Sequence, residues 1–353
     1  MIPTFLTRAK FLVKNKDSIL GIRLAIYGYD SDIGQLVLET FNEQNLIIED
    51  FYPLSPIPGE YDAVKVNGIN YFVQPIYEFD FSKVNVALFL TTQDESTRWV
   101  QKAKDAGCIV IDNSHLFSGD EKTPVIVPEI NPFEIKKAIE SRIVIPALAP
   151  SVQLCLALSV LHDEFGIAKA NVTSLESVSE FGRLGTQTLA HETTLLLNGM
   201  AADHQGFDSQ LAFNLHNKIG ISDEGGYTDH ENTISYEVSK ILGKFERGFD
   251  ITCLLVPVFY GHTMVVNVEL EQTASLDEVK KAFVDSEFTA IDEEDKVLSP
   301  VEDIINQRQV LVSRIRSQNK GNKAYSFVIM MDNTRRGEAI SCVEILKLLS
   351  KSL

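Results

Sequence analysis

Apolar runs alternate with amphipathic helical segments over the first third of the chain, and this alternation constrains the fold most strongly. A run that is apolar at nearly every position, such as 84–90, is typical of a parallel strand that is buried on both faces. Strands that alternate with helices imply right-handed crossovers and therefore a doubly wound parallel sheet of α/β class. The predicted strands cover 23–27, 47–52, 84–90 and 108–111, and the predicted helices cover 32–42 and 95–106.

Beyond about residue 145 the pattern changes to strands that alternate between apolar and polar positions. Such alternation is typical of a sheet with one half-exposed face. The chain has 353 residues, which is more than one compact core usually holds, so a second domain is expected. The predicted strands cover 172–179, 251–257, 264–270 and 310–316, with the second and third read as antiparallel, and the predicted helices cover 152–165, 277–285 and 336–351.

The charge and hydropathy of the chain exclude two classes of partner. The formal net charge is −17, so the chain mostly repels the phosphates of nucleic acid, and the pair Arg335–Arg336 is better explained as solvated or ligand-facing arginines than as a basic patch. No stretch of eighteen or more apolar residues is present, so no membrane span is expected. Residues 1–19 lack the features of a secretory signal and are interpreted as an N-terminal tail or extra helical turn.

The four cysteines predict neither a disulfide framework nor a metal site. Cys108, Cys155, Cys253 and Cys342 form no CxxC pair and no Cys/His cluster with zinc spacing. Three of them lie in apolar strand or helix patterns, where a free cysteine packs as a small hydrophobe. We therefore expect no bound metal, no disulfide, and a reducing cytoplasmic compartment.

The loop after the first predicted strand has the position of a dinucleotide pyrophosphate site. Gly28 and Gly34 match the first and last glycines of a G-x-x-G-x-x-G loop, whereas Ser31 stands at the middle glycine. Asp30 and Asp32 add negative charge where a pyrophosphate would lie, and one like-charge pair about 4 Å apart costs roughly 4 kcal/mol at an effective dielectric near 20. Between a working nucleotide site and a strand-to-helix turn inherited from one, the sequence favours the inherited turn.

Six segments in one order along the chain resemble motifs of the aspartate-semialdehyde dehydrogenase family. Together they run from about Arg23 to the C-terminus, and a match that is collinear over this length indicates the fold. Usg-type paralogues of the family that lack the catalytic cysteine resemble this chain most. The segments, each with the motif that it resembles, are 110–114 (VIDNSS), 124–131 (VPLVVPEVN), 226–242 (GYTxEE…ExxKIL), 256–263 (VPVxxGHS), 312–316 (VGRIR) and 332–337 (DNLxKG).

The resemblance implies a division into domains and a reaction. It implies a Rossmann-type domain over 20–145 that is completed by 326–353, and a central α/β catalytic-like domain with a mixed sheet over 146–325. The central domain pairs two chains as a homodimer in the family, and predicted strands 251–258 and 264–270 are apolar on both faces, which favours the same pairing here. Family members interconvert an aldehyde and an acyl phosphate with NADP, through a cysteine thiolate that attacks the aldehyde.

The position of the family's nucleophile holds an alanine in this chain. The family's NPNCSTIQ segment resembles Pro146–Gln153, which places Ala149 at the cysteine. A methyl group cannot attack a carbonyl. Cys155 lies well over a helical turn further on, where the acidifying effect of a helix start has faded, so it is interpreted as core. Ser151 has no evident base beside it, and it is interpreted as a helix N-cap.

Other family positions are changed in the same direction. Glu176 stands at a glutamine, and the groups that would hold substrate anions are lost, since Leu and Thr side chains cannot make charge-assisted bonds. His262 keeps the family's base position, with the alternative that it is a satisfied buried histidine. The lost cations are at Leu255 (arginine), Ser118 (arginine) and Thr233 (lysine), the retained substrate-like residues are Glu237 and Asn113, and the cofactor-binding positions are Gly28, Ser31, Ile33, Gly34 and Asn333.

Three hypotheses about function follow. The first is a catalytically inactive homologue that acts as a dimeric, ligand- or partner-binding pseudo-enzyme, with no cofactor bound tightly. The second is an active oxidoreductase of amino-acid biosynthesis that uses NADP or NAD on an aldehyde/acyl-phosphate pair, which requires either an unrecognised mechanism or a different placement of the catalytic loop. The third is another enzyme that uses Glu176, Glu237 and His262 for acid–base work.

Overall fold

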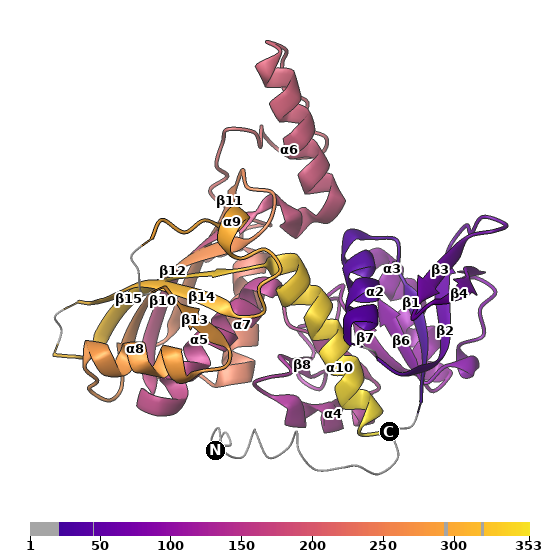
Figure 1. Ribbon diagram of the computed structural model, residues 1–353, viewed down its shortest axis with the longest axis horizontal. Helices are drawn as coiled ribbons and strands as arrows, with labels where there is room; N and C mark the ends of the chain where they lie inside the picture. Colours follow the sequence, from indigo (N-terminus) through magenta and orange to yellow (C-terminus); the bar gives the residue numbers. More distant parts are fainter. Residues whose placement is uncertain (1–20, 45, 293–295, 319–320) are drawn as a thin grey trace. The chain divides into compact units, whose positions relative to one another are not determined.

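The computed structural model describes residues 21–44, 46–292, 296–318 and 321–353, and these form two compact units (Figure 1). The first unit contains residues 21–147 and 338–353, and the second contains residues 148–337. The expected N-terminal tail, 1–19, lies outside the described residues. No described helix is long and apolar enough to cross a membrane.

The first unit is built on a seven-stranded sheet in which every pair of neighbours is parallel, so the predicted doubly wound sheet is confirmed. The strand order is β5-β2-β1-β6-β7-β9-β8, and it reverses direction between β1 and β6. The strands are β1 (Ile22–Tyr27), β2 (Ile48–Ser55), β5 (Gln74–Pro75), β6 (Val86–Phe89), β7 (Ile109–Asp112), β8 (Val125–Ile126) and β9 (Ile143–Pro146). A separate hairpin joins β3 (Ala63–Val66) to β4 (Ile69–Phe72).

Apolar clusters cover both faces of this sheet, which explains why its strands are apolar at nearly every position. Leu24 and Ile26 of β1 belong to a cluster on one face with residues of α2 and α10. Ala25 and Tyr27, which point to the opposite face, belong to a second cluster with residues of α3. The helices are α2 (Asp32–Gln44), α3 (Gln93–Asp105), α4 (Ile135–Ser141) and α10 (Ile340–Ser350).

The second unit is built on a six-stranded mixed sheet in the order β11-β10-β12-β15-β14-β13. The expectation of antiparallel strands holds for β12, which lies antiparallel to β10 and β15. It is wrong for β11, which is parallel to β10 and occupies the edge. The strands are β10 (Ile167–Ser177), β11 (Phe249–Val256), β12 (His262–Leu270), β13 (Thr289–Ile291), β14 (Val310–Ser317) and β15 (Ala324–Met331).

One face of this sheet is packed against helices, and the other is only half buried. Along β12 the side chains from His262 to Leu270 alternate between buried and half-buried. The expectation that β11 and β12 are apolar on both faces is wrong, because the half-buried positions of β12 are Thr263, Val265, Asn267 and Glu269. The helices of the unit are α5 (Ala149–Phe165), α6 (Gly182–Leu197), α7 (Asp229–Leu242), α8 (Leu276–Asp285) and α9 (Pro300–Asp303).

Helix α6 projects away from the sheet of its unit (Figure 1). Only four of its residues are buried: Gly185, Thr188, Leu189 and Glu192. The sequence analysis did not predict this helix, because its apolar residues follow no clear helical stripe. Its exposed apolar side chains include Leu184 and Leu197, which are 50% and 76% exposed.

The division between the units near the C-terminus differs from the expected boundary at residue 326. Strand β15 is hydrogen-bonded to β12 on one side and to β14 on the other, so 326–331 belong to the second sheet. A π-helical segment over Asn333–Ala339 follows, and the chain enters the first unit at Glu338. Within the first unit α10 contacts α2, α4 and β9, as expected for a helix that completes this domain.

Candidate functional site

The glycine loop of the first unit is a strand-to-helix turn in which neighbouring backbone segments lie very close together. Gly28 has a φ of +92°, and a Cβ there would lie 2.1 Å from the carbonyl oxygen of Leu90. A Cβ at Gly34 would lie 2.2 Å from the carbonyl oxygen of Gly28. Both positions therefore require glycine for packing alone. Ile33, the expected cofactor-contacting residue between them, is half-buried and packs on the adjacent core cluster.

The Ser31 side chain caps the N-terminus of α2, at the place where a pyrophosphate would bind in a dinucleotide site. Its hydroxyl donates to the carbonyl of Gly28 at 2.8 Å and accepts the backbone N–H of Gly34 at 3.0 Å. A free N–H at a helix start is the usual donor to a phosphate. Here the protein's own side chain satisfies that donor, and Asp32 adds an acidic residue in the first turn.

Two expected substrate positions lie in the first unit, where each has a protein partner. Asn113 follows β7, and its amide donates to the carboxylate of Glu338 at 3.0 Å. Ser118 is buried, and its hydroxyl donates to the carbonyl of His115. Neither residue carries the positive charge that an anion site requires.

In the second unit, charged and polar side chains gather where β10 ends. Alternate residues of this strand face the helices, so Ser174 and Glu176 lie on one face and both are fully buried. Their partners on β11 are Cys253 opposite Ser174 and Leu255 opposite Glu176. The sheet register therefore places Cys253 beside a buried carboxylate that is distant in sequence.

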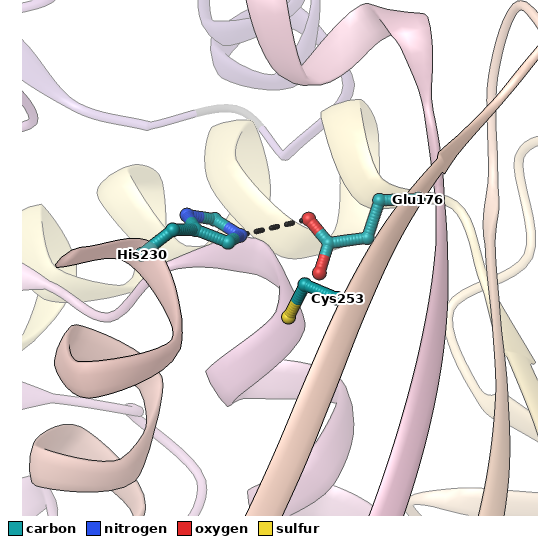
Figure 2. Close-up of side chains that lie close together, drawn as sticks. All are labelled: Glu176, His230 and Cys253. Carbon is teal, nitrogen blue, oxygen red and sulfur yellow. Dashed lines mark hydrogen bonds and ion pairs between the residues drawn. The ribbon is translucent and has the colours of Figure 1, made fainter. Parts of the chain in front are cut away.

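His230 pairs with Glu176 across this cluster (Figure 2). It lies in the first turn of α7, whose start is fixed by a capping box between Thr228 and Glu231. The imidazole Nε2 lies 2.8 Å from the Glu176 carboxylate, and the hydroxyl of Ser174 donates to the same carboxylate at 2.9 Å. The side chain of His230 is 11% exposed and that of Glu176 is 0% exposed.

The pKa values of Glu176 and His230 are those of an ion pair. Burial opposes ionisation of Glu176, but the charge of His230 and its hydrogen bond outweigh burial and lower the pKa of the carboxyl to about 2. Burial likewise opposes protonation of His230, and the Glu176 charge outweighs it, which raises the pKa of the imidazole to about 9. Burial, followed by the neighbouring Glu176 charge, raises the pKa of the Cys253 thiol.

His262, at the family's base position, is fully buried and has two partners. Its Nδ1 accepts the backbone N–H of Ser177 at 3.2 Å. A backbone amide can only donate, so the neutral ring carries its hydrogen on Nε2, which donates to Glu180 at 3.2 Å. The expected base is therefore engaged with a carboxylate that the sequence analysis did not single out.

The position that resembles the family's nucleophile, Ala149, is tightly packed. Ala149 is 2% exposed at the start of α5, and a Cβ at Gly337 would lie 2.6 Å from the Ala149 methyl group. Helix α5 begins at Ala149, with Leu148 as its N-cap residue. The expectation that Ser151 caps this helix is wrong, because Ser151 lies inside its first turn. Cys155 is fully buried in the same helix.

Glu237, which the third hypothesis names with Glu176 and His262, has a partner at the start of α5. Glu237 is fully buried on α7 and accepts the backbone N–H of Leu148 at 2.9 Å. A carboxylate at this point stabilises the start of α5. Thr233, on the same helix, donates to the carbonyl of Asp229.

Leu255 and Asn333 are two further expected site residues, and both lie in the second unit. Leu255, at a lost arginine, lines a cavity of about 550 Å³ together with Phe181, Phe207 and Ile221. Asn333, an expected cofactor residue, accepts the backbone N–H of Gly261 at 2.8 Å and bonds to Ser179. It thereby ties the start of β12 to the end of β10. Arg336 is buried and donates to the carbonyl of Arg308, so the Arg335–Arg336 pair is not a solvated patch.

Three residues that gather at the end of β10 were not predicted from the sequence: Glu180, His230 and Cys253. His230 stands at the first glutamate of the GYTxEE motif. Residues 175–182 resemble the family segment YQAVSGAG, and Glu180 stands at its first glycine. Those departures were the available signal for both. For Cys253 the signal was absent, because only the pairing of β10 with β11 brings it to Glu176.

Comparison with known proteins gives agreement over nearly the whole chain. The dimerisation-domain model of semialdehyde dehydrogenases matches residues 158–336, and the corresponding NAD-binding-domain model matches residues 24–138. Aspartate-semialdehyde dehydrogenase 2 of Vibrio cholerae is 32% identical over 92% of this chain and 97% of its own length. A USG-1 protein homolog of Azotobacter vinelandii is 29% identical over 94% of this chain and 98% of its own.

Solved structures agree with the sequence comparison. The crystal structure of aspartate semialdehyde dehydrogenase II from Vibrio cholerae complexed with ASA is 31% identical to this chain and has a TM-score of 0.89. The similarity covers 94% of this chain and 99% of that one. With matching family models, relatives and structures over both units, the chain belongs to the aspartate-semialdehyde dehydrogenase family.

Proposed function

We propose that this chain is a catalytically inactive member of its family, a dimeric pseudo-enzyme that binds a ligand or partner. The observation that carries the proposal is Ala149 at the position that resembles the family's nucleophile. The family's reaction needs a thiolate that attacks the aldehyde carbon. The side chain of Ala149 is buried and has no group that can do so.

Neither thiol of the second unit supports a replacement nucleophile. Cys155 lies in the buried middle of α5. Burial, followed by the neighbouring Glu176 charge, raises the pKa of the Cys253 thiol, so it is a poor thiolate. The loss of Arg and Lys at Leu255, Ser118 and Thr233 also removes the charges that would hold substrate. These changes support a site that keeps its scaffold and has lost the family's chemistry.

The first unit contains the family's NAD-binding domain, but we propose that it binds NADP or NAD weakly. Ser31 occupies the Gly34 amide, and Asp30 and Asp32 place negative charge at the same turn. Calorimetry should give a dissociation constant for NADP no tighter than about millimolar, or roughly −4 kcal/mol. Micromolar binding would contradict this part of the proposal and favour an active oxidoreductase.

We also propose that the chain forms a homodimer through its dimerisation domain. The projecting helix α6 and the segment after it expose several large apolar side chains, and a symmetric interface would cover them. The most exposed of them are Leu197 (76%), Phe213 (68%) and Ile221 (77%). Sedimentation should give twice the 39.4 kDa chain mass at micromolar concentration. A stable monomer would refute the dimer.

The decisive experiment is a steady-state assay with aspartate semialdehyde, phosphate and NADP. The expected result is no detectable reduction of NADP, with the Vibrio cholerae enzyme as the positive control. Turnover on the ordinary enzyme scale of about 1 to 1000 per second would overturn the proposal. The third hypothesis, acid–base chemistry by Glu176, Glu237 and His262, is less well supported, because Glu237 is engaged at the start of α5.

A further inference from the structure

Three side chains with different ligand atoms converge in the second unit. A carboxylate oxygen of Glu176, an imidazole nitrogen of His230 and the Sγ of Cys253 all lie within 4.8 Å of one another (Figure 2). They come from three elements: the end of β10, the first turn of α7, and β11. We propose that these three side chains bind one transition-metal ion of the Zn²⁺ class, with a fourth position open to water.

The spacing of the ligand atoms suits such an ion. Zinc binds nitrogen, oxygen and sulfur at about 2.0–2.3 Å, so two ligands of a tetrahedral ion lie roughly 3.3–3.8 Å apart. The Nε2 of His230 and the carboxylate of Glu176 are now 2.8 Å apart, joined by a hydrogen bond. Insertion of an ion replaces that bond and separates the two atoms by about 1 Å or less.

The chemical identity of the ligands selects the class of metal. A thiolate with an imidazole and one carboxylate suits Zn²⁺ or Co²⁺, whereas Mg²⁺ and Ca²⁺ prefer oxygen alone. Three protein ligands leave one tetrahedral position for water or a ligand. No metal was expected from the sequence, because the spacing of Cys and His matches no zinc motif. These three ligands come together only in the folded protein.

Neighbouring groups hold the ligands in place. The hydroxyl of Ser174 donates to one oxygen of Glu176 at 2.9 Å, which leaves the other oxygen for the ion. Glu231 accepts the backbone N–H of Cys253 at 2.8 Å and also closes the capping box at the start of α7. Outer partners of this kind orient metal ligands in known metal sites.

Charge balance is preserved when the ion enters. Without metal, the Glu176 carboxylate is balanced by protonated His230, and Cys253 is a neutral thiol. The ion displaces one proton from His230 and one from Cys253, and both protons leave to solvent. Two positive charges thus replace two protons, and the buried site keeps the same net charge, which avoids the cost of an uncompensated buried charge.

A second group, Glu176 with Glu180 and His262, also has ligand atoms within 4.8 Å. It is the weaker candidate. The Nδ1 of His262 accepts the backbone N–H of Ser177, so Nε2 carries the hydrogen and has no lone pair for a metal. The two groups are distinguishable by experiment, because only the first contains a thiol.

The test is titration of the full-length, chelator-treated protein with Co²⁺, followed by displacement with Zn²⁺. We expect one ion per chain and a sulfur-to-cobalt charge-transfer band in the near ultraviolet, which Zn²⁺ abolishes. Cys253→Ala should remove the band, and His230→Gln and Glu176→Gln should each weaken binding at least tenfold. Ser174→Ala should weaken it about 10- to 100-fold, as expected for loss of an outer partner.

Cys108→Ala is the matched control, since Cys108 is also a buried free thiol but lies in the first unit and donates to the carbonyl of Phe81. This variant should keep the band and its intensity. Absence of the band in the unaltered protein, or its persistence in Cys253→Ala, overturns the site. Circular dichroism confirms that each variant is folded, and Glu176→Gln, which restores the family's residue type, keeps the test valid if the Cys253 variant unfolds.

Discussion

The two units of this protein depart from their family in different ways. In the first unit the glycine loop keeps its backbone path, and the change is a serine that caps its own helix. In the second unit we propose that the charged groups at the end of β10 differ in type from those of the motifs that they resemble. On this proposal the first unit keeps a backbone geometry, whereas the second has new side-chain chemistry.

This difference shows which residue types the fold itself requires. Gly28 and Gly34 are required by close contacts between backbone atoms, whether or not a nucleotide binds. Nothing in the packing of the second sheet requires a buried carboxylate at Glu176 or an imidazole at His230, since burying them costs solvation energy. The cluster at Glu176 is therefore stronger evidence of a function than the loop at Gly28.

The largest expected effect is on catalysis. Ala149→Cys places a cysteine at the position that resembles the family's nucleophile, and we expect it to give no turnover on the scale of about 1 to 1000 per second. The reason is that Leu255 and Ser118 supply no charge for substrate, and Glu176 and His262 are tied to His230 and Glu180. Assay with aspartate semialdehyde, phosphate and NADP measures it. Strong rescue by this single change would show that the second unit has kept its substrate site.

The next largest effect concerns the buried ion pair. His230→Ala leaves the Glu176 carboxylate buried without its charged partner and should lower the free energy of unfolding by about 3–5 kcal/mol. The double variant Glu176→Gln with His230→Gln should cost less than the sum of its single changes, because no lone charge is left. Urea denaturation with a chelator present measures both.

A matched control for this change is His191→Ala, since His191 is 44% exposed on α6. It should change stability by no more than about 0.5 kcal/mol. An equally small effect of His230→Ala would show that the cluster is not a strong ion pair, and the contrast between the units would weaken.

A third prediction concerns the first unit. Gly28→Ala should cost more than about 2 kcal/mol, because an L-residue at positive φ is strained and the new Cβ meets the carbonyl of Leu90 at 2.1 Å. Gly107 has a φ of +98° but no atom within 4 Å of its Cβ position. Gly107→Ala is therefore the control that isolates the strain alone. Equal losses of melting temperature in the two variants would show that the loop contact is unimportant.

The smallest expected effect concerns the buried carboxylate of Glu192. Burial opposes ionisation of Glu192, but hydrogen bonds from His204 and from the backbone of Ala212 and Leu211 outweigh it and lower its pKa. A lowered folded-state pKa stabilises above the unfolded value of about 4.3, and that stability is lost as the pH falls below it. Glu192→Gln should cost about 1–3 kcal/mol at neutral pH.

This difference between Glu192→Gln and the unaltered protein should shrink below about pH 4.3, because the side chain becomes protonated there in the unfolded protein and only at lower pH in the folded protein. Thermal melting at a series of pH values measures it. A difference that stays constant down to pH 3 would mean that the charge of Glu192 contributes nothing to the anchoring of the segment after α6.

Sequence reasoning determined the parts of this protein that local patterns encode. The apolar runs of β1, β6 and β7 predicted a parallel sheet, because strands covered on both faces must be apolar at both. Collinear motifs predicted the family, which the comparisons confirm, and they predict that Ala149 stands at the nucleophile position. Helix α6 was not predicted because no apolar stripe marks it, and a polar contact, Glu192 with the backbone N–H groups of Leu211 and Ala212, joins it to the segment that follows.

Only the tertiary structure decided the composition of the cluster at Glu176. Parallel pairing of β10 with β11 fixes Cys253 beside Ser174, and the capping box of α7 directs His230 to Glu176. Glu176, His230 and Cys253 are separated by 23 to 77 positions in the sequence, and the register between strands that lie far apart along the chain is not encoded in local periodicity. The same holds for β15, which is mostly apolar and is buried at every position, and whose hydrogen bonds to β12 and β14 place it in the second unit.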